Sequence, residues 1–127
     1  MNLPAHSGEQ GQQANEASAA IHALRLAGAA RFDPVRLHFL EVLAQRTLAQ
    51  QGQVRHLLDT KLSQALAAFS ARFAHAQAEA QASIDQVALQ HPQAVAHLQG
   101  LCQAGDVNGV RRAVASLVKS SPPASLG

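Results

Sequence analysis

The longest regular pattern in the chain is a series of apolar side chains that recur every three or four residues between residues 53 and 90. The mean step of about 3.7 residues matches an α-helix and exceeds the 3.5 of a left-handed coiled coil. The second half of this segment alternates Ala with polar residues, as a strand would. Because Ala, Gln and Glu are strong helix formers and poor strand formers, the pattern still predicts one long helix.

Local start and stop signals predict two helices before the long one. Asp33 followed by Pro34 is typical of an N-cap and a first helical position, and it opens a broadly apolar helix over residues 34–50. An earlier helix over residues 14–27 carries a narrow apolar stripe. Gly28 ends it, because glycine readily adopts the left-handed conformation that closes a helix.

The C-terminal quarter predicts two short helices. His91-Pro92 breaks the long helix, since proline cannot continue one. Gly105 is a natural C-terminal stop, and Asp106 beside it is a natural N-cap for the following helix. We therefore expect a helix pair within residues 91–120.

Together these segments predict an all-α protein. We expect an antiparallel helical hairpin or small bundle over residues 14–90, with one long helix, followed by the short C-terminal helix pair over 91–120. Residues 1–13 are polar and contain two glycines, and residues 121–127 begin with Ser-Pro-Pro, so both predict disordered tails. The sequence leaves open whether the alanine-rich part, residues 74–90, packs or projects.

The large apolar side chains between residues 34 and 73 predict the core of the hairpin. Phe69 and Phe73 lie one turn apart, and we expect them to meet Phe39 across the hairpin. Any of this apolar surface left exposed would recruit a partner. The candidate core and interaction face comprises Val35, Phe39, Leu43, Leu58, Leu62, Leu66, Phe69 and Phe73.

Composition favours a protein partner or self-association over a small-molecule substrate. Twenty-seven residues are alanine, which forms helices readily but buries little area, so the core should be thin. A partner could complete the burial. The chain has no Trp or Tyr, the side chains that often anchor ligand pockets.

The charge pattern raises an alternative, in which a basic helical protein associates non-specifically with nucleic acid. The net charge is +2 and the pI is about 9.3, and residues 25–72 hold seven basic against three acidic side chains. No run of basic residues exists, so the solvated face of a helical bundle is the favoured explanation of the pattern. The candidate basic face comprises Arg25, Arg31, Arg36, Arg46, Arg55, Lys61 and Arg72.

Candidate chemistry is sparse, and we expect neither an enzyme nor a bound cofactor or metal. His38 and Glu41 have the helical i, i+3 spacing of possible metal ligands, but one such pair does not make a metal site. Cys102 lies on an apolar stripe, which favours a buried structural thiol over a nucleophile. Arg55 and Asp59 have the i, i+4 spacing of an ordinary surface pair.

The sequence predicts a cytoplasmic protein. A single cysteine cannot form an internal disulfide, which favours a reducing compartment. The first residues lack the basic and apolar regions of a secretory signal. No window approaches the 18 apolar residues of a transmembrane helix.

Part of the chain resembles a proteobacterial family known only as a domain of unknown function (number twenty-eight ninety-four). The resemblance spans residues 17–73. It rests on Arg31-Phe32-Asp33-Pro34-Val35-Arg36, on His38-Phe39-Leu40-Glu41, and on Val54-Arg55 with Leu57-Leu58-Asp59. Because that family has no assigned activity, the resemblance implies no catalytic residues.

The resemblance implies a cellular setting. Genes of the family tend to lie near those for stator-type proton channels and OmpA-like envelope proteins, which implies an accessory role beside an envelope complex. Family members continue into a further C-terminal helical segment, whereas this chain ends soon after Ser-Pro-Pro, as a shortened or divergent member would.

Overall fold

The protein is all-α, as predicted. The computed structural model describes residues 15–120, and the two predicted tails, residues 1–13 and 121–127, lie outside the described range. The described residues contain no strand. Their helices are residues 15–26, α2 (Ala29–Phe32), α3 (Pro34–Leu48), α4 (Gly52–Ala88), the 3-10 turn η1 (Pro92–Ala94), α5 (Val95–Gln103) and α6 (Val107–Ser120).

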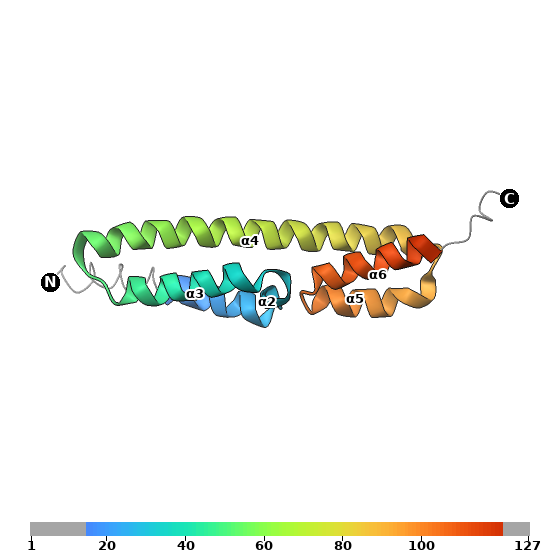
Figure 1. The fold of residues 1–127 in the computed structure, drawn as a ribbon, viewed down its shortest axis with the longest axis horizontal. Helices are drawn as coiled ribbons and strands as arrows, with labels where there is room; N and C mark the ends of the chain where they lie inside the picture. Colours follow the sequence, from blue (N-terminus) through green and yellow to red (C-terminus); the bar gives the residue numbers. More distant parts are fainter. Residues whose placement is uncertain (1–14, 121–127) are drawn as a thin grey trace.

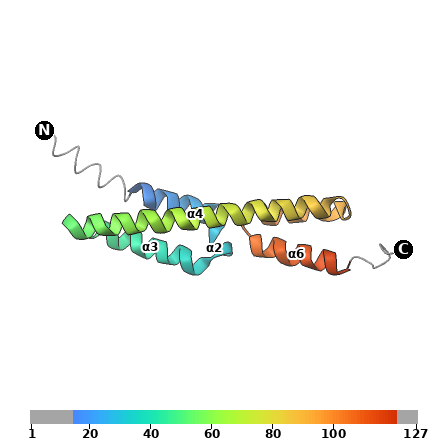
Figure 2. The same ribbon diagram turned by 90° about the horizontal axis from the view of Figure 1, so that it is seen from above.

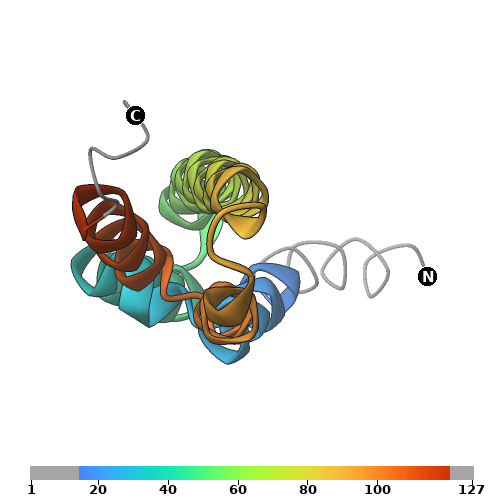
Figure 3. The same ribbon diagram turned by 90° about the vertical axis from the view of Figure 1, so that its right-hand side faces the viewer.

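Helix α4 is the spine of the molecule, and two helical hairpins lie along it (Figure 1). At 1.5 Å per residue its 37 residues span roughly 55 Å. The helix of residues 15–26 and α3 cover its first half, whereas α5 and α6 cover its second half (Figure 2). Viewed down the long axis, α6 lies in line with α3, and α5 with the first helix (Figure 3). Each half of the molecule is therefore a three-helix bundle.

The tips of the two hairpins meet near the middle of α4, at two glycines with left-handed backbones. Gly28 has a φ of 88° and Gly105 a φ of 79°. A Cβ atom on Gly28 would overlap the carbonyl oxygen of Ala104, and one on Gly105 would overlap that of Ala27. Both positions therefore require glycine for conformation and for the close approach of the two backbones.

The helix boundaries follow the local signals closely. The Asp33 side chain accepts a hydrogen bond from the Arg36 N–H at 3.0 Å, and Asp106 accepts one from the Gly109 N–H at 2.9 Å. Gly105 closes α5 in a Schellman motif, in which the Asp106 N–H reaches the Leu101 carbonyl at 2.9 Å. Both predicted N-caps and the predicted glycine stop are thus confirmed. The short helix α2 was not predicted.

The alanine-rich second half of α4 packs rather than projects. Ala76 and Ala80 are buried together with Ile84 and Val87. The small side chains of the two alanines let α5 and α6 approach α4 closely. This part of the core is completed by Leu98, Cys102, Val107 and Val110. Cys102 is buried, and its Sγ lies 3.9 Å from the Gln77 carbonyl oxygen.

The predicted core of the first half needs correction on α3. Leu62, Phe69 and Phe73 are buried on α4, and Leu43, Leu58 and Leu66 are partly buried. Val35 and Phe39, however, are 77% and 55% exposed. α3 instead buries Leu37, Leu40, Ala44 and Thr47. The small side chains of Ala44 and Thr47 let α3 approach its neighbours closely.

Phe32 of α2 takes the place that was predicted for Phe39. Its ring centroid lies 6.1 Å from that of Phe69 and 5.3 Å from that of Phe73. The prediction for Phe39 failed because Phe32 lies before the start of α3, in a helix of only four residues, where periodicity carries no information on burial. Arg55 and Asp59 do form the expected i, i+4 ion pair, at 3.4 Å between Nε and Oδ2, but its predicted place on the surface was wrong, since the two side chains are only 13% and 7% exposed.

Candidate functional site

Helix α3 carries two apolar stripes on nearly opposite faces. The buried stripe follows residues 37, 40, 44 and 47, whereas Val35, Phe39, Val42 and Arg46 form a second stripe with the same helical spacing. At 100° per residue the centres of the two stripes lie about 150° apart. We call the second stripe the α3 ridge. It faces away from the core.

The α3 ridge surrounds a shallow, almost wholly apolar hollow on the outer surface. Val35, Phe39, Val42 and Leu43 line it, with Arg46 and His38 at its edges. Val42 and Leu43 are half-buried, so the most exposed apolar side chains are Val35 and Phe39. A contiguous apolar surface of this kind is a feature of interaction sites, whereas scattered exposed residues are not.

A second hollow runs between α3 and α4 beside the ridge, and we call it the α3–α4 groove. Its floor is formed by the buried Leu40 and Phe69. Phe39 forms one wall, and the small side chains of Ala65 and Ala68 form the other. Arg36 and Arg72 line the groove from opposite helices. The sequence analysis did not predict Ala65 and Ala68 as part of a site, because their helical spacing is the only signal that they carry.

Arg72 is held in place at one end of this groove. Its Nη2 lies 3.1 Å from the Asp33 Oδ2, and its guanidinium carbon lies 5.6 Å from the Phe32 ring centroid and 5.9 Å from that of Phe69. Burial acts to raise the pKa of Asp33. The Arg36 N–H and the positive charges of Arg72 and Arg36 outweigh burial, so the pKa lies below its ordinary value.

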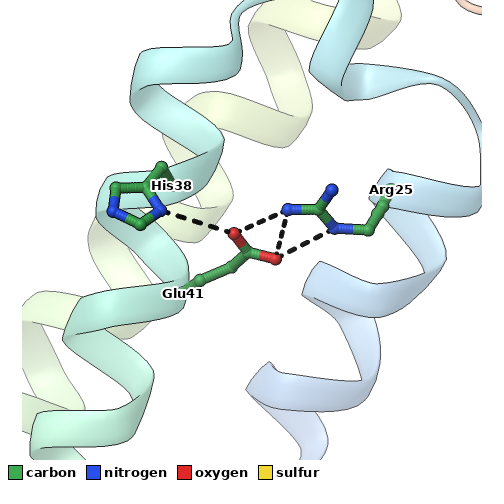
Figure 4. A network of polar contacts seen from close by, with 3 residues as sticks. All are labelled: Arg25, His38 and Glu41. Carbon is green, nitrogen blue, oxygen red and sulfur yellow. Dashed lines mark hydrogen bonds and ion pairs between the residues drawn. The ribbon is translucent and has the colours of Figure 1, made fainter.

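On the other side of α3, a bidentate ion pair ties the helix of residues 15–26 to α3 (Figure 4). Arg25 Nε donates to the Glu41 Oε2 at 3.0 Å, and its Nη2 donates to Oε1 at 2.7 Å and to Oε2 at 2.6 Å. His38 Nδ1 lies 3.9 Å from Oε1, and its side chain is mostly exposed. This cluster links the two helices of the first hairpin. Arg25 donates to both oxygens of the Glu41 carboxylate, so the cluster has a structural role.

The structure divides the predicted basic face into two groups. Arg25, Arg55 and Arg72 pair with Glu41, Asp59 and Asp33, which are the three acidic residues of that region. The other four basic residues are exposed and form no ion pair with any residue between 15 and 120. These are Arg31, Arg36, Arg46 and Lys61. The seven residues therefore do not form one continuous face.

No group of three or more His, Cys, Asp or Glu side chains between residues 15 and 120 is placed to hold a metal ion. In the same range, no helix is both long enough and apolar enough to cross a membrane. Exposed apolar side chains flanked by unneutralised cations are thus the chemically distinctive feature of this surface.

Comparison with known proteins extends the resemblance seen in the sequence. A family model described as "Protein of unknown function (DUF2894)" matches residues 21–125. The match therefore includes α5 and α6 in addition to the N-terminal motifs, which lie within residues 31–59. No curated protein and no solved structure matches the chain.

Proposed function

This chain belongs to the DUF2894 family, whose description assigns no activity, and we propose that it is a non-catalytic helical module that binds another protein. The exposed apolar α3 ridge is the observation that carries this proposal. Two of its members, Val35 and Phe39, are 77% and 55% exposed although they belong to an otherwise well-packed helix. Covering them would remove apolar surface from water, which favours association.

The composition of the surface supports an interface rather than a reaction site. Interface centres are enriched in aromatic side chains and arginine, and they are depleted in acidic ones. The ridge and groove contain Phe39, Arg36 and Arg46 and are lined by no acidic residue. The neighbouring carboxylates are engaged, since Asp33 caps α3 and Glu41 binds Arg25.

We further propose that the module acts in the cytoplasm as an accessory to a bacterial envelope complex that contains a proton channel or an OmpA-like protein. The family resemblance supports this setting. The single buried cysteine and the pairing of helices around α4 are compatible with it. Co-purification with such a complex from detergent-solubilised envelopes would test the setting separately from the interaction itself.

Site-specific photo-crosslinking in the native host tests the interaction. A photoreactive residue at position 39 is expected to yield one dominant protein adduct of defined mass. The matched control is position 45, because Gln45 is exposed on another face of the same helix. Equal labelling from both positions, or no protein adduct from position 39, would argue against an interface at the ridge.

The alternative is non-specific association with nucleic acid through the exposed cations Arg31, Arg36, Arg46 and Lys61. Counterion release then requires that binding weaken steeply as salt rises. The test is fluorescence anisotropy of a labelled mixed-sequence duplex and a labelled single strand, titrated with the full chain at low and physiological salt. A salt-dependent increase in anisotropy would favour this alternative, and its absence would eliminate it.

A further inference from the structure

We infer that the α3–α4 groove binds an acidic amphipathic α-helix of the partner protein. The inference rests on the proposed function and adds the partner's chemistry to it. The observation behind it is an apolar groove that is lined by two arginines and by no acidic side chain, with two further exposed cations beyond it on the same two helices.

The shape of the groove fits a helix. Leu40 and Phe69 form an apolar floor, and Ala65 and Ala68 form a low wall on α4, so a third helix can approach closely along it. Phe39 stands at the opposite edge as an exposed aromatic anchor. In this recognition mode an amphipathic helix lays apolar side chains at i, i+3 or i+4, and i+7 into the groove.

The cations define the chemistry of the incoming helix. Arg36 and Arg72 line one end of the groove. Arg46 follows Arg36 by ten residues, and Lys61 precedes Arg72 by eleven on the antiparallel α4. At about 1.5 Å per residue, both therefore lie roughly 15 Å further along the two helices, beyond the residues that line the groove, and Arg46 borders the hollow of the α3 ridge. A bound helix would meet positive charge at both ends, roughly three turns apart.

Charge also selects among possible occupants. All three acidic residues of the region 25–72 are used in ion pairs with Arg25, Arg55 and Arg72. The rim cations Arg36, Arg46 and Lys61 have no such partner within residues 15–120. The same groove of a second copy would bring like charges together. A nucleic-acid backbone would gain nothing from the apolar centre of the groove.

The test uses a designed probe and the full chain. The probe is a fluorescein-labelled helical peptide of about 18 residues, with leucines on one stripe and glutamates at both ends of it. A peptide of the same composition with a shuffled stripe and a peptide with Gln in place of Glu serve as controls. Binding is read by fluorescence anisotropy at two salt concentrations, and sedimentation velocity of the protein alone is recorded in parallel.

Two protein variants carry the same change in charge. Arg36→Glu with Lys61→Glu reverses one cation in the groove and one beyond its far end, and both positions are exposed enough to accept either residue. Arg112→Glu with Lys119→Glu reverses two exposed cations on α6, outside the groove. We expect the first pair to weaken peptide binding by about tenfold or more, and the second by less than about twofold. Phe39→Ala should weaken binding by about tenfold while shifting the thermal midpoint by no more than about 2 °C.

Several outcomes would overturn the inference. These are no peptide binding, equal binding of the shuffled or Gln peptide, or equal weakening by the two pairs of charge reversals. Concentration-dependent self-association lost in Phe39→Ala would identify a second copy as the occupant, and groove-dependent binding of DNA alone would identify nucleic acid. If the peptide fails while position 39 still crosslinks a protein, the partner chemistry is wrong but the proposed function stands.

Discussion

The contact between the two hairpin tips predicts that alanine substitutions at four glycines have sharply different effects. At Gly28, alanine must adopt a φ of 88° and its Cβ overlaps the Ala104 carbonyl oxygen. At Gly52 the φ is 65°, but no atom lies within 4 Å of the added Cβ. Gly100 is helical with open space around it. At Gly105, on the tip of the other hairpin, the φ is 79° and the added Cβ overlaps the Ala27 carbonyl oxygen.

The magnitudes follow from these differences. The left-handed conformation costs alanine roughly 1–2 kcal/mol, and overpacking adds about 1–3 kcal/mol. Gly28→Ala and Gly105→Ala should therefore each destabilise by about 2–5 kcal/mol, and Gly52→Ala by about 1–2 kcal/mol. Gly100→Ala should stabilise by about 0.5–1 kcal/mol, since it removes flexibility from a helix interior.

The assay is thermal and urea unfolding followed by circular dichroism at 222 nm. For a domain of about 100 residues, each kcal/mol shifts the midpoint by roughly 4 °C, so the tip variants should lose about 8–20 °C and Gly52→Ala about 4–8 °C. The double variant at both tips should cost less than the sum, because one alanine already separates the tips. If Gly28→Ala lowered the midpoint no more than Gly52→Ala does, the backbone contact between the tips would contribute nothing to stability.

Three further predictions concern the core and the ion pairs. Phe69→Ala should destabilise by about 3–5 kcal/mol in urea unfolding, whereas Phe39→Ala should change stability by at most about 0.5 kcal/mol; similar losses would contradict the assignment of the ridge. The pKa of Asp33 is lowered in the folded state, so its ionised form stabilises the fold above its unfolded pKa, and that stability is lost as the pH falls through the folded pKa. Asp33→Asn keeps a capping side chain, so its stability deficit against the native chain should shrink as the pH falls below about 4; a constant deficit would refute the role of charge. Arg25→Ala should cost at most about 1 kcal/mol at low salt, and less at high salt, when measured by thermal unfolding; a larger, salt-independent loss would show that the side chain acts through packing.

Local signals in the sequence were sufficient to place most helices. Helix α3 was predicted over residues 34–50 and ends at Leu48, and α4 was predicted over 53–90 and spans Gly52–Ala88. Caps such as Asp33 and stops such as Gly105 act within one turn of the chain, so their effect can be recognised without a tertiary structure. The boundaries of α2 had no such signal, because its four residues are too few to show periodicity.

The candidate site was only partly accessible from the sequence. Val35 and Phe39 were predicted to lie on the core face of α3, but this helix is apolar over most of its circumference, so periodicity alone did not show which side is buried. The structure buries the side with Leu37, Leu40 and Ala44. Which side of a helix is buried depends on the surfaces that pack against it. On α3 the small side chains of Ala44 and Thr47 let the neighbouring helices approach closely.

The sequence by itself determined the all-α class, the long central helix and the caps that begin and end its neighbours. Tertiary structure decided which stripe of α3 is buried, that Phe32 joins Phe69 and Phe73, and that Gly28 meets Gly105. The physical reason is the range of the interactions. Helix propensity and capping join residues a few positions apart, whereas packing and ion pairs join residues separated by tens of positions, whose proximity only the folded chain creates.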